Sequence, residues 1–161
     1  MKEIIIYTTR YGCTEKAVKL IQLKAAKEIK AVNLAFEKVP DLHHYDTIIL
    51  GGPIYVGKLP KELSTFIQQN LEILKSKRLV LFLCAGEQDP IAIEKLFSSA
   101  FTEELNKHAI YKEALGGELH LDQLSFITKL ILRIFKGINK DYSRLSEEKI
   151  ENLARRMIVK E

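Results

Sequence analysis

The sequence predicts an α/β domain in which a parallel sheet is covered by helices on both faces. Short apolar runs alternate with longer helical patterns along the whole chain, which is typical of repeated β-α units. Two of these runs, Thr47–Leu50 and Leu79–Leu83, are almost uninterrupted, as expected for strands that are buried on both faces. The 161 residues contain no linker or low-complexity segment, so we expect a single domain over residues 1–161.

The expected helices are bounded by residues that favour a helix start. Pro60 and Pro90 stand in the first turn, where proline is tolerated, and Ser146 precedes two glutamates that suit a helix N-terminus. No clear helical pattern occupies the segment between Leu34 and Tyr45, so that crossover is left open. The expected strands are Glu3–Thr8, Lys30–Leu34, Thr47–Gly51, Arg78–Cys84 and Ala109–Leu115, and the expected helices are Thr14–Lys27, Pro60–Leu74, Pro90–Asn106 and Ser146–Lys160.

Composition narrows the class of function. Hydrophobic residues make up 47% of the chain and charged residues 29%, and no apolar run reaches the roughly 18 residues of a membrane span. Since the N-terminus also lacks a signal-peptide pattern, we expect a cytoplasmic protein. Cys13 and Cys84 lack metal-ligand spacing, so no metal site is expected. We also expect no nucleic-acid partner. The net charge of +4 is concentrated in residues 122–145, which hold five basic and two acidic residues.

The segment after the first strand has the composition of an anion-binding loop. The hydroxyls of Thr8, Thr9 and Thr14 can donate hydrogen bonds, and the unpaired N–H groups at the start of a helix point in the same direction. Gly12 allows the backbone to approach a ligand closely. A phosphate fits this loop, although an ordinary turn with Thr14 as the helix N-cap would have the same composition.

Two further loops leave the carboxyl ends of predicted strands, where ligands bind in open parallel sheets. Gly51–Pro60 is rich in glycine and apolar residues, with the flat ring of Tyr55 beside a Gly57 peptide that can flip. Such a loop suits a planar heteroaromatic ligand, but Ile54–Val56 could instead fold back onto the sheet. Ala85–Gln88 could offer backbone donors and acceptors to the opposite edge of that ligand.

These loops resemble those of the flavodoxin family. Thr8–Thr14 resembles the flavodoxin phosphate loop, Gly51–Lys58 the loop that packs against the flavin ring, and Tyr45–Gly51 the strand leading to it. The resemblance implies the doubly wound flavodoxin-like fold, with strand order 2-1-3-4-5 and FMN at the edge of the sheet. It implies that Thr8, Thr9, Arg10, Gly12, Cys13 and Thr14 hold the phosphate, that Pro53, Ile54 and Tyr55 line the ribityl chain and ring, that Gly57 offers its peptide to flavin N5, and that Ala85, Gly86 and Glu87 meet the pyrimidine side.

Residues 117–143 form a basic amphipathic insertion before the last helix. Within residues 124–136, Lys129, Arg133 and Lys136 follow one helical stripe, and apolar residues dominate the rest of the circumference. A helix of this kind can lie on an anionic membrane surface or dock on a partner, so peripheral contact with the inner face of a membrane through residues 124–140 is one expectation. The other is that the helix packs on the sheet and exposes only its basic stripe.

The insertion also resembles the corresponding stretch of the menaquinone-dependent protoporphyrinogen dehydrogenases, through Asp122, Phe126, Lys129–Ile131 and Gly137. This resemblance implies an FMN-dependent oxidoreductase that passes electrons between a reduced substrate and a quinone-type acceptor. The alternative is a soluble flavodoxin-type electron carrier whose basic charge selects an acidic redox partner. The flavin would perform the chemistry in both cases, and His120 is the only histidine that we consider as an acid or base.

Lys58 departs from the ordinary flavodoxin pattern. It directly follows Gly57, at a position where many flavodoxins carry an acidic residue. A cation near the ring favours the anionic reduced flavin, so we hypothesise a reduction potential less negative than that of a carrier flavodoxin. The alternative is that Lys58 points into solvent and contributes little.

Overall fold

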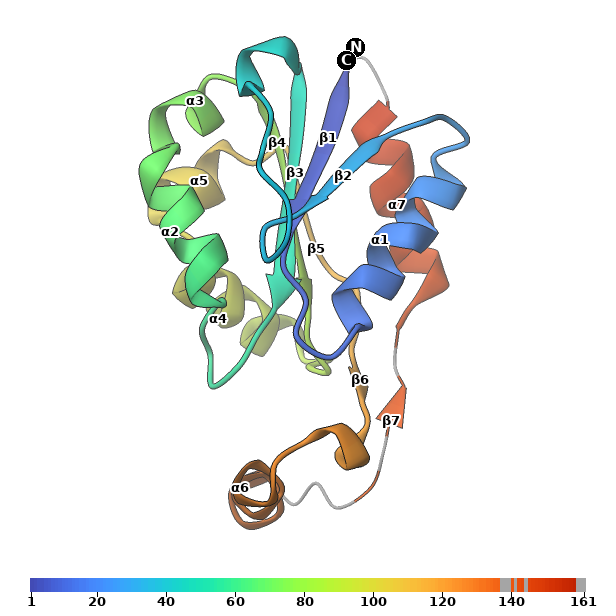
Figure 1. Ribbon diagram of the computed structural model, residues 1–161, viewed down its shortest axis with the longest axis vertical. Helices are drawn as coiled ribbons and strands as arrows, with labels where there is room; N and C mark the ends of the chain where they lie inside the picture. Colours follow the sequence, from blue (N-terminus) through green and yellow to red (C-terminus); the bar gives the residue numbers. More distant parts are fainter. Residues whose placement is uncertain (137–139, 141, 144, 159–161) are drawn as a thin grey trace.

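The computed structural model describes residues 1–136, 140, 142–143 and 145–158, and it shows a five-stranded sheet between two layers of helices (Figure 1). The strand order is β2-β1-β3-β4-β5, and all four neighbouring pairs are parallel, which confirms the predicted order. The strands are β1 (Glu3–Tyr7), β2 (Lys30–Asn33), β3 (Thr47–Pro53), β4 (Arg78–Cys84) and β5 (Tyr111–Ala114).

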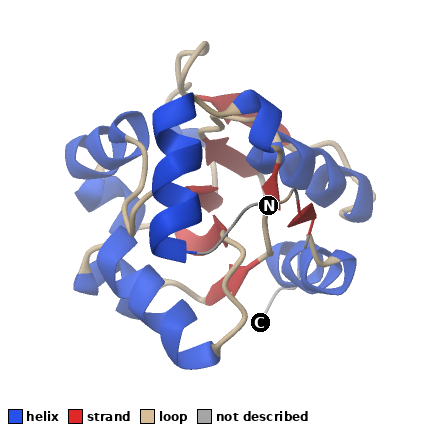
Figure 2. Cartoon of the chain, turned by 90° about the horizontal axis from the view of Figure 1, so that it is seen from below, coloured by secondary structure: helices blue, strands red, loops and turns tan. Residues whose placement is uncertain are grey.

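The two faces of the sheet bury alternate residues of each strand. Ile5 and Ile49 face one helical layer, while Ile4 and Ile48 face the other, as the two-residue period of a strand requires. Seen along the strands, the helices surround the sheet on both sides (Figure 2). The first layer contains α1 (Cys13–Lys24) and α7 (Glu147–Ile158), and the second contains α2 (Lys61–Gln69), α3 (Leu71–Lys75), α4 (Pro90–Ala100) and α5 (Glu103–His108).

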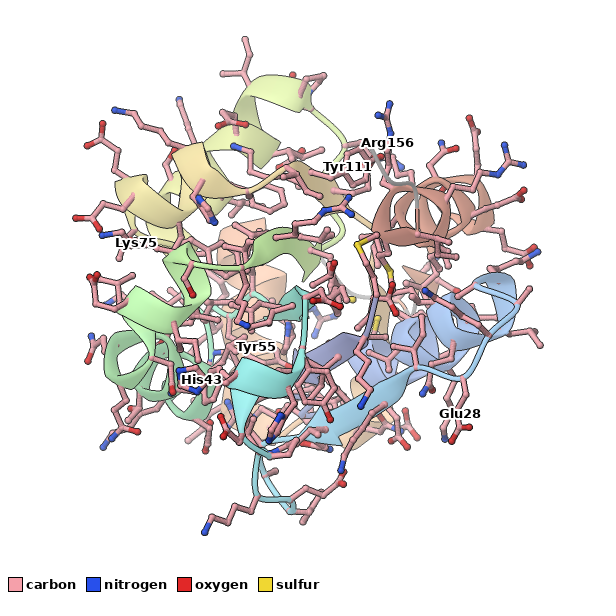
Figure 3. The ribbon with its side chains drawn as sticks, turned by 90° about the horizontal axis from the view of Figure 1, so that it is seen from above. Glu28, His43, Tyr55, Lys75, Tyr111 and Arg156 are labelled. Atoms are coloured by element: carbon pink, nitrogen blue, oxygen red, sulfur yellow. The ribbon has the colours of Figure 1, made fainter. Side chains whose placement is uncertain are left out.

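Close packing of the central strands depends on one glycine. Gly51 pairs with Phe82 across β3 and β4, and a Cβ atom at Gly51 would lie 2.2 Å from the Phe82 ring. The ring therefore occupies the space that any larger residue at position 51 would need. At the edge of the same face, the guanidinium of Arg156 lies 5.6 Å from the centre of the Tyr111 ring, which joins α7 to β5 (Figure 3).

Two predicted helices are each divided in two. The helix expected over Pro60–Leu74 breaks at Asn70, whose φ is −121° and whose side chain donates a hydrogen bond to the Phe66 carbonyl at 2.8 Å. The helix expected over Pro90–Asn106 breaks at the buried, extended Phe101, after which the Thr102 hydroxyl caps α5. Asn and Thr side chains offer the backbone hydrogen bonds that compete with a continuous helix.

The remaining differences are small shifts of the ends. The first helix begins one residue earlier and ends three residues earlier than the expected Thr14–Lys27, and the third strand extends to Pro53. The crossover from β2 to β3 contains a short 3₁₀ turn, η1 (Leu42–His44), which explains why its sequence has no helical pattern. The last two residues of the helix expected over Ser146–Lys160 lie outside the described residues.

The insertion forms an arm at the end of the sheet where the strands finish (Figure 1). Its base is a two-stranded antiparallel ribbon of β6 (Glu118–Leu119) and β7 (Tyr142–Ser143), which the sequence analysis did not predict. Beyond the ribbon lie a 3₁₀ turn, η2 (Leu121–Gln123), and the expected helix, α6 (Phe126–Lys136). Gly137, part of the resemblance in this segment, lies outside the described residues. Across the part of the chain that the structure describes, no helix is both long enough and apolar enough to span a bilayer.

Candidate functional site

Three loops meet at the carboxyl edge of the sheet. They follow β1, β3 and β4 and cover residues 8–12, 54–60 and 85–89. Because β3 lies between β1 and β4 and all three strands are parallel, the loops emerge side by side. This is the edge at which ligands bind in open α/β sheets.

The first loop ends in a helix start that no side chain occupies. Gly12 is the N-cap of α1 with a φ of +88°, and no cap hydrogen bond from a side chain is present among the described residues. A Cβ atom at Gly12 would have no atom within 4 Å, so glycine is favoured here by its backbone angle rather than by space. The alternative with Thr14 as N-cap is wrong, because Thr14 lies inside α1. The first N–H groups of α1 therefore remain available to an anion.

Two buried hydroxyls, one in this loop and one in the first turn of α1, lack ordinary hydrogen bonds. Thr8 is 3% exposed and Thr14 is fully buried, and within the described residues neither Oγ1 atom has a hydrogen-bond partner of normal geometry. The weakly polar thiol of Cys84 lies beside the Thr14 hydroxyl. A buried hydroxyl without a partner costs about 1–3 kcal/mol, so a bound group that accepts a hydrogen bond from it would relieve the cost. Thr9 differs, because its hydroxyl already accepts a hydrogen bond from the Gly12 N–H at 3.1 Å.

Arg10 links the first loop to the second. Its guanidinium lies 5.9 Å from the centre of the Tyr11 ring and 5.4 Å from that of Tyr55. The two rings contact edge to face, with centres 5.9 Å apart. Burial, and then proximity to Tyr11, raise the pKa of Tyr55 above its ordinary value, so its hydroxyl is neutral at physiological pH. A permanent positive charge therefore lies between the expected phosphate loop and the expected ring loop.

The second loop is a tight turn with backbone strain. Tyr55 and Lys58 exchange backbone hydrogen bonds of 2.9 and 3.0 Å, and Val56 and Gly57 between them have φ values of 50° and 72°. Positive φ at both central positions defines a type I′ turn. Ile54 packs against the core and Tyr55 is half-buried, but Val56 is 90% exposed, so the segment Ile54–Val56 only partly folds back onto the sheet.

A cleft of about 400 Å³ separates these two loops. Thr8, Thr9 and Arg10 line one side, and Tyr55 and Lys58 line the other. Its volume falls within the roughly 300–1,000 Å³ of small-molecule sites. The exposed Lys58 lies at its margin, where a side chain can reach either the cleft or solvent.

The third loop is held by its own side chain and by the chain after β5. The Glu87 carboxylate accepts hydrogen bonds from the N–H groups of Gln88 and Asp89 at 2.8 and 2.9 Å. A Cβ atom at Gly117 would lie 3.0 Å from the Gly86 nitrogen, so the arm begins in close contact with this loop. With its carboxylate engaged in the turn, Glu87 offers a ligand mainly its backbone, as do Ala85 and Gly86.

The sequence analysis missed the contacts that attach the arm to α1. The Glu118 N–H donates to Cys13 Sγ at 3.2 Å, and the Glu118 carboxylate is hydrogen-bonded to Lys16 Nζ at 2.5 Å and to the Ser143 hydroxyl at 2.8 Å. Burial tends to raise the pKa of Glu118, but the bonds from Lys16 and Ser143 outweigh it and lower the pKa. A hydrogen bond with Cys84 lowers the pKa of the Cys13 thiol, against the opposing effect of burial. Glu118 lies 102 positions from Lys16 and 105 from Cys13, so no local spacing could have predicted these contacts with α1.

His120, the acid or base candidate, lies on the arm rather than in the three loops. Its Nε2 atom is 3.8 Å from a Glu118 carboxylate oxygen, and nearly half of its side chain is exposed. The structure therefore places it beside the ion pair that anchors the arm.

The family follows from comparison with known proteins. The family model described as flavodoxin domain matches residues 4–146. The chain belongs to the flavodoxin family. Its fold is similar to that of flavodoxin 2 from Bacillus cereus, with a TM-score of 0.59 and 22% identity over 98% of this chain and 96% of that one. Flavodoxin 1 from the same species has a TM-score of 0.52 and 19% identity over 86% of this chain and 100% of that one. The fold is also similar to that of a flavodoxin from the domain Archaea, with a TM-score of 0.53 and 13% identity over 98% of this chain and 99% of that one. No curated protein matches the sequence.

FMN is the cofactor of this flavodoxin domain, and the site fits it. The buried Thr8 hydroxyl without a partner and the uncapped start of α1 suit a phosphate that accepts hydrogen bonds. Arg10 adds a positive charge, and the cleft beside Tyr55 has room for a planar ring system. The first and second loops therefore offer groups to both ends of the molecule, whereas Ala85, Gly86 and Glu87 do not line this cleft.

Proposed function

We propose that this flavodoxin domain is an FMN-dependent oxidoreductase that passes electrons between a reduced substrate and a quinone-type acceptor. The observation that carries the proposal is the position of the basic arm, which stands at the same end of the sheet as the three flavin loops (Figure 1). A simple carrier has no need of an added apolar helix at this end. The menaquinone-dependent protoporphyrinogen dehydrogenases, which the insertion resembles, are the class of enzyme that fits best.

In this proposal the protein binds, orients and shields the FMN, and bound FMN supplies one- or two-electron transfer. The start of α1 and Arg10 oppose the phosphate charge. Tyr55 offers its ring as an apolar wall, and its neutral hydroxyl adds no negative charge near the flavin. Lys58 adds a positive charge at the margin of the cleft, which favours anionic reduced flavin.

A soluble electron carrier is the second candidate. The domain has the strand order expected of a flavodoxin, and its net charge of +4 suits an acidic redox partner. In that case the arm would contact the partner protein.

Anaerobic oxidation of the FMN-loaded, reduced protein separates the two candidates. Flavin absorbance is followed after mixing with a water-soluble naphthoquinone or with an acidic oxidised carrier protein such as a ferredoxin. The oxidoreductase predicts reoxidation by the quinone with saturation, and a loss of saturation when the arm is shortened. The carrier predicts faster reoxidation by the acidic protein, suppressed by salt, and no saturation with the quinone.

A further inference from the structure

Helix α6 presents an apolar face that no part of the described chain covers. Phe126, Ile127, Leu130, Ile131 and Ile134 are 79%, 69%, 45%, 47% and 65% exposed. With 3.6 residues per turn, these five positions fall within an arc of about 140°. The half-buried Thr128 and Leu132 lie on the opposite side of the helix, so the apolar arc is its most exposed side.

The charged residues of α6 are all basic. The helix carries Lys129, Arg133 and Lys136 and has no acidic residue. Helical geometry places Lys129 and Arg133 together along one border of the apolar arc. An apolar face bordered by basic residues is the pattern of helices that lie in the plane of a membrane interface.

The orientation of the arm is set by its base. Glu118 binds Lys16 of α1 and Ser143 of β7, so both strands of the ribbon are tied to the start of α1. Helix α6 lies across the carboxyl end of the sheet and is the helix nearest the viewer in Figure 2. Its axis therefore runs crosswise to the strands, as it would if this end of the domain rested on a flat surface.

We infer that α6 docks this protein on an anionic lipid bilayer, with the flavin end of the domain turned toward the membrane. The inference of docking is drawn from α6 alone, whereas access of the flavin to a lipid-soluble acceptor rests on the proposed function. A bilayer accepts a single helix at a depth of roughly 5–10 Å, and anionic headgroups attract the basic border. Five exposed side chains are far fewer than the roughly 20–30 residues per partner of a stable protein interface, which argues against a second copy as the occupant.

The test is cosedimentation of the FMN-loaded protein with vesicles of phosphatidylcholine alone or mixed equally with phosphatidylglycerol. We expect binding to the mixed vesicles, weak binding to phosphatidylcholine, and release as salt shortens the screening length. I127E/I131E should abolish binding. K129Q/R133Q should weaken it about 30-fold, since each basic residue near an anionic surface contributes roughly fivefold.

L23E/F36E is the matched control. Leu23 and Phe36 are 73% and 86% exposed but lie outside the arm, so this variant adds the same two charges and should bind as the wild type does. The chain has no tryptophan, so F126W provides a single reporter whose emission should shift to the blue with anionic vesicles only. Equal sedimentation of wild type and I127E/I131E, or an unshifted F126W spectrum, would overturn the inference.

The same samples separate this inference from the function on which part of it rests. Flavin absorbance of the pelleted protein reports FMN retention independently of membrane binding. Retained FMN without sedimentation overturns only the docking, and sedimentation without FMN supports the docking while contradicting the proposed function. Self-association that is lost in I127E/I131E, measured by analytical ultracentrifugation without lipid, would assign the face to a second copy and also overturn the docking.

Discussion

Thr8→Val should stabilise the protein without FMN and weaken its binding of FMN. The Thr8 hydroxyl is buried without a hydrogen-bond partner among the described residues, and valine has the same shape without the hydroxyl. Removal of an unsatisfied buried hydroxyl should raise the free energy of unfolding by about 1 kcal/mol. A hydrogen bond to a charged phosphate is worth about 1.5–3 kcal/mol, so the dissociation constant of FMN should rise roughly 10- to 150-fold.

These two effects reverse the order of stability when FMN is added. At an FMN concentration of about 100 times the wild-type dissociation constant, the ligand stabilises the wild type by about 2.7 kcal/mol. A variant that binds about 30-fold more weakly gains only about 0.9 kcal/mol. Added to its initial advantage of about 1 kcal/mol, this leaves Thr8→Val about 0.8 kcal/mol less stable than the wild type in FMN.

Urea unfolding followed by far-ultraviolet circular dichroism measures the stabilities of the wild type and of Thr8→Val, each with and without FMN. Thr9→Val is the contrast, because the Thr9 hydroxyl already accepts a hydrogen bond from Gly12 N–H at 3.1 Å. It should lower stability by about 1 kcal/mol even without FMN. The reasoning is refuted if Thr8→Val is less stable than the wild type without FMN, or if it binds FMN with unchanged affinity.

Three further predictions concern the ring loop and the base of the arm. Val56→Asn should raise the free energy of unfolding by about 1 kcal/mol, since asparagine tolerates the φ of 50° better than a β-branched residue; chemical denaturation measures this, and an unchanged midpoint would contradict the strain. The contacts of Glu118 lower its pKa, so they stabilise the protein at pH values above 4.5, the ordinary pKa of a glutamate, and this contribution is lost as the pH falls through the folded-state pKa. Glu118→Gln should therefore flatten the acid side of a plot of stability against pH, and an unaltered plot would contradict this. Lys58→Glu should lower the flavin midpoint potential in a reductive titration, and an unchanged potential would place Lys58 out of electrostatic reach.

The sequence predicted the sheet well because its central strands are buried on both faces. Thr47–Leu50 and Leu79–Leu83 are apolar without alternation, and the structure places both in the middle of the sheet. The helix breaks could not be predicted in the same way. Asn70 and Phe101 interrupt helical periodicity because of a side-chain hydrogen bond to the backbone and a buried ring, respectively, and both depend on local competition or tertiary packing.

Part of the site was predictable because parallel strands bring their following loops to one edge. Thr8, Arg10 and Tyr55 come from loops separated by more than forty residues, yet the order of the strands was enough to expect them together. The cap at Gly12 and the strain at Val56 depend on backbone angles that composition does not reveal. The roles of Gly57 and of Ala85 toward a flavin stay predictions.

Comparison of FMN with riboflavin tests the phosphate site most directly. The two ligands share the ring and ribityl chain and differ only in the phosphate, and quenching of flavin fluorescence reports the binding of each. We expect one FMN per chain and riboflavin binding at least 100-fold weaker, because the start of α1, the Thr8 hydroxyl and Arg10 all act on the phosphate. Equal affinities for the two ligands, or no binding of FMN, would contradict it.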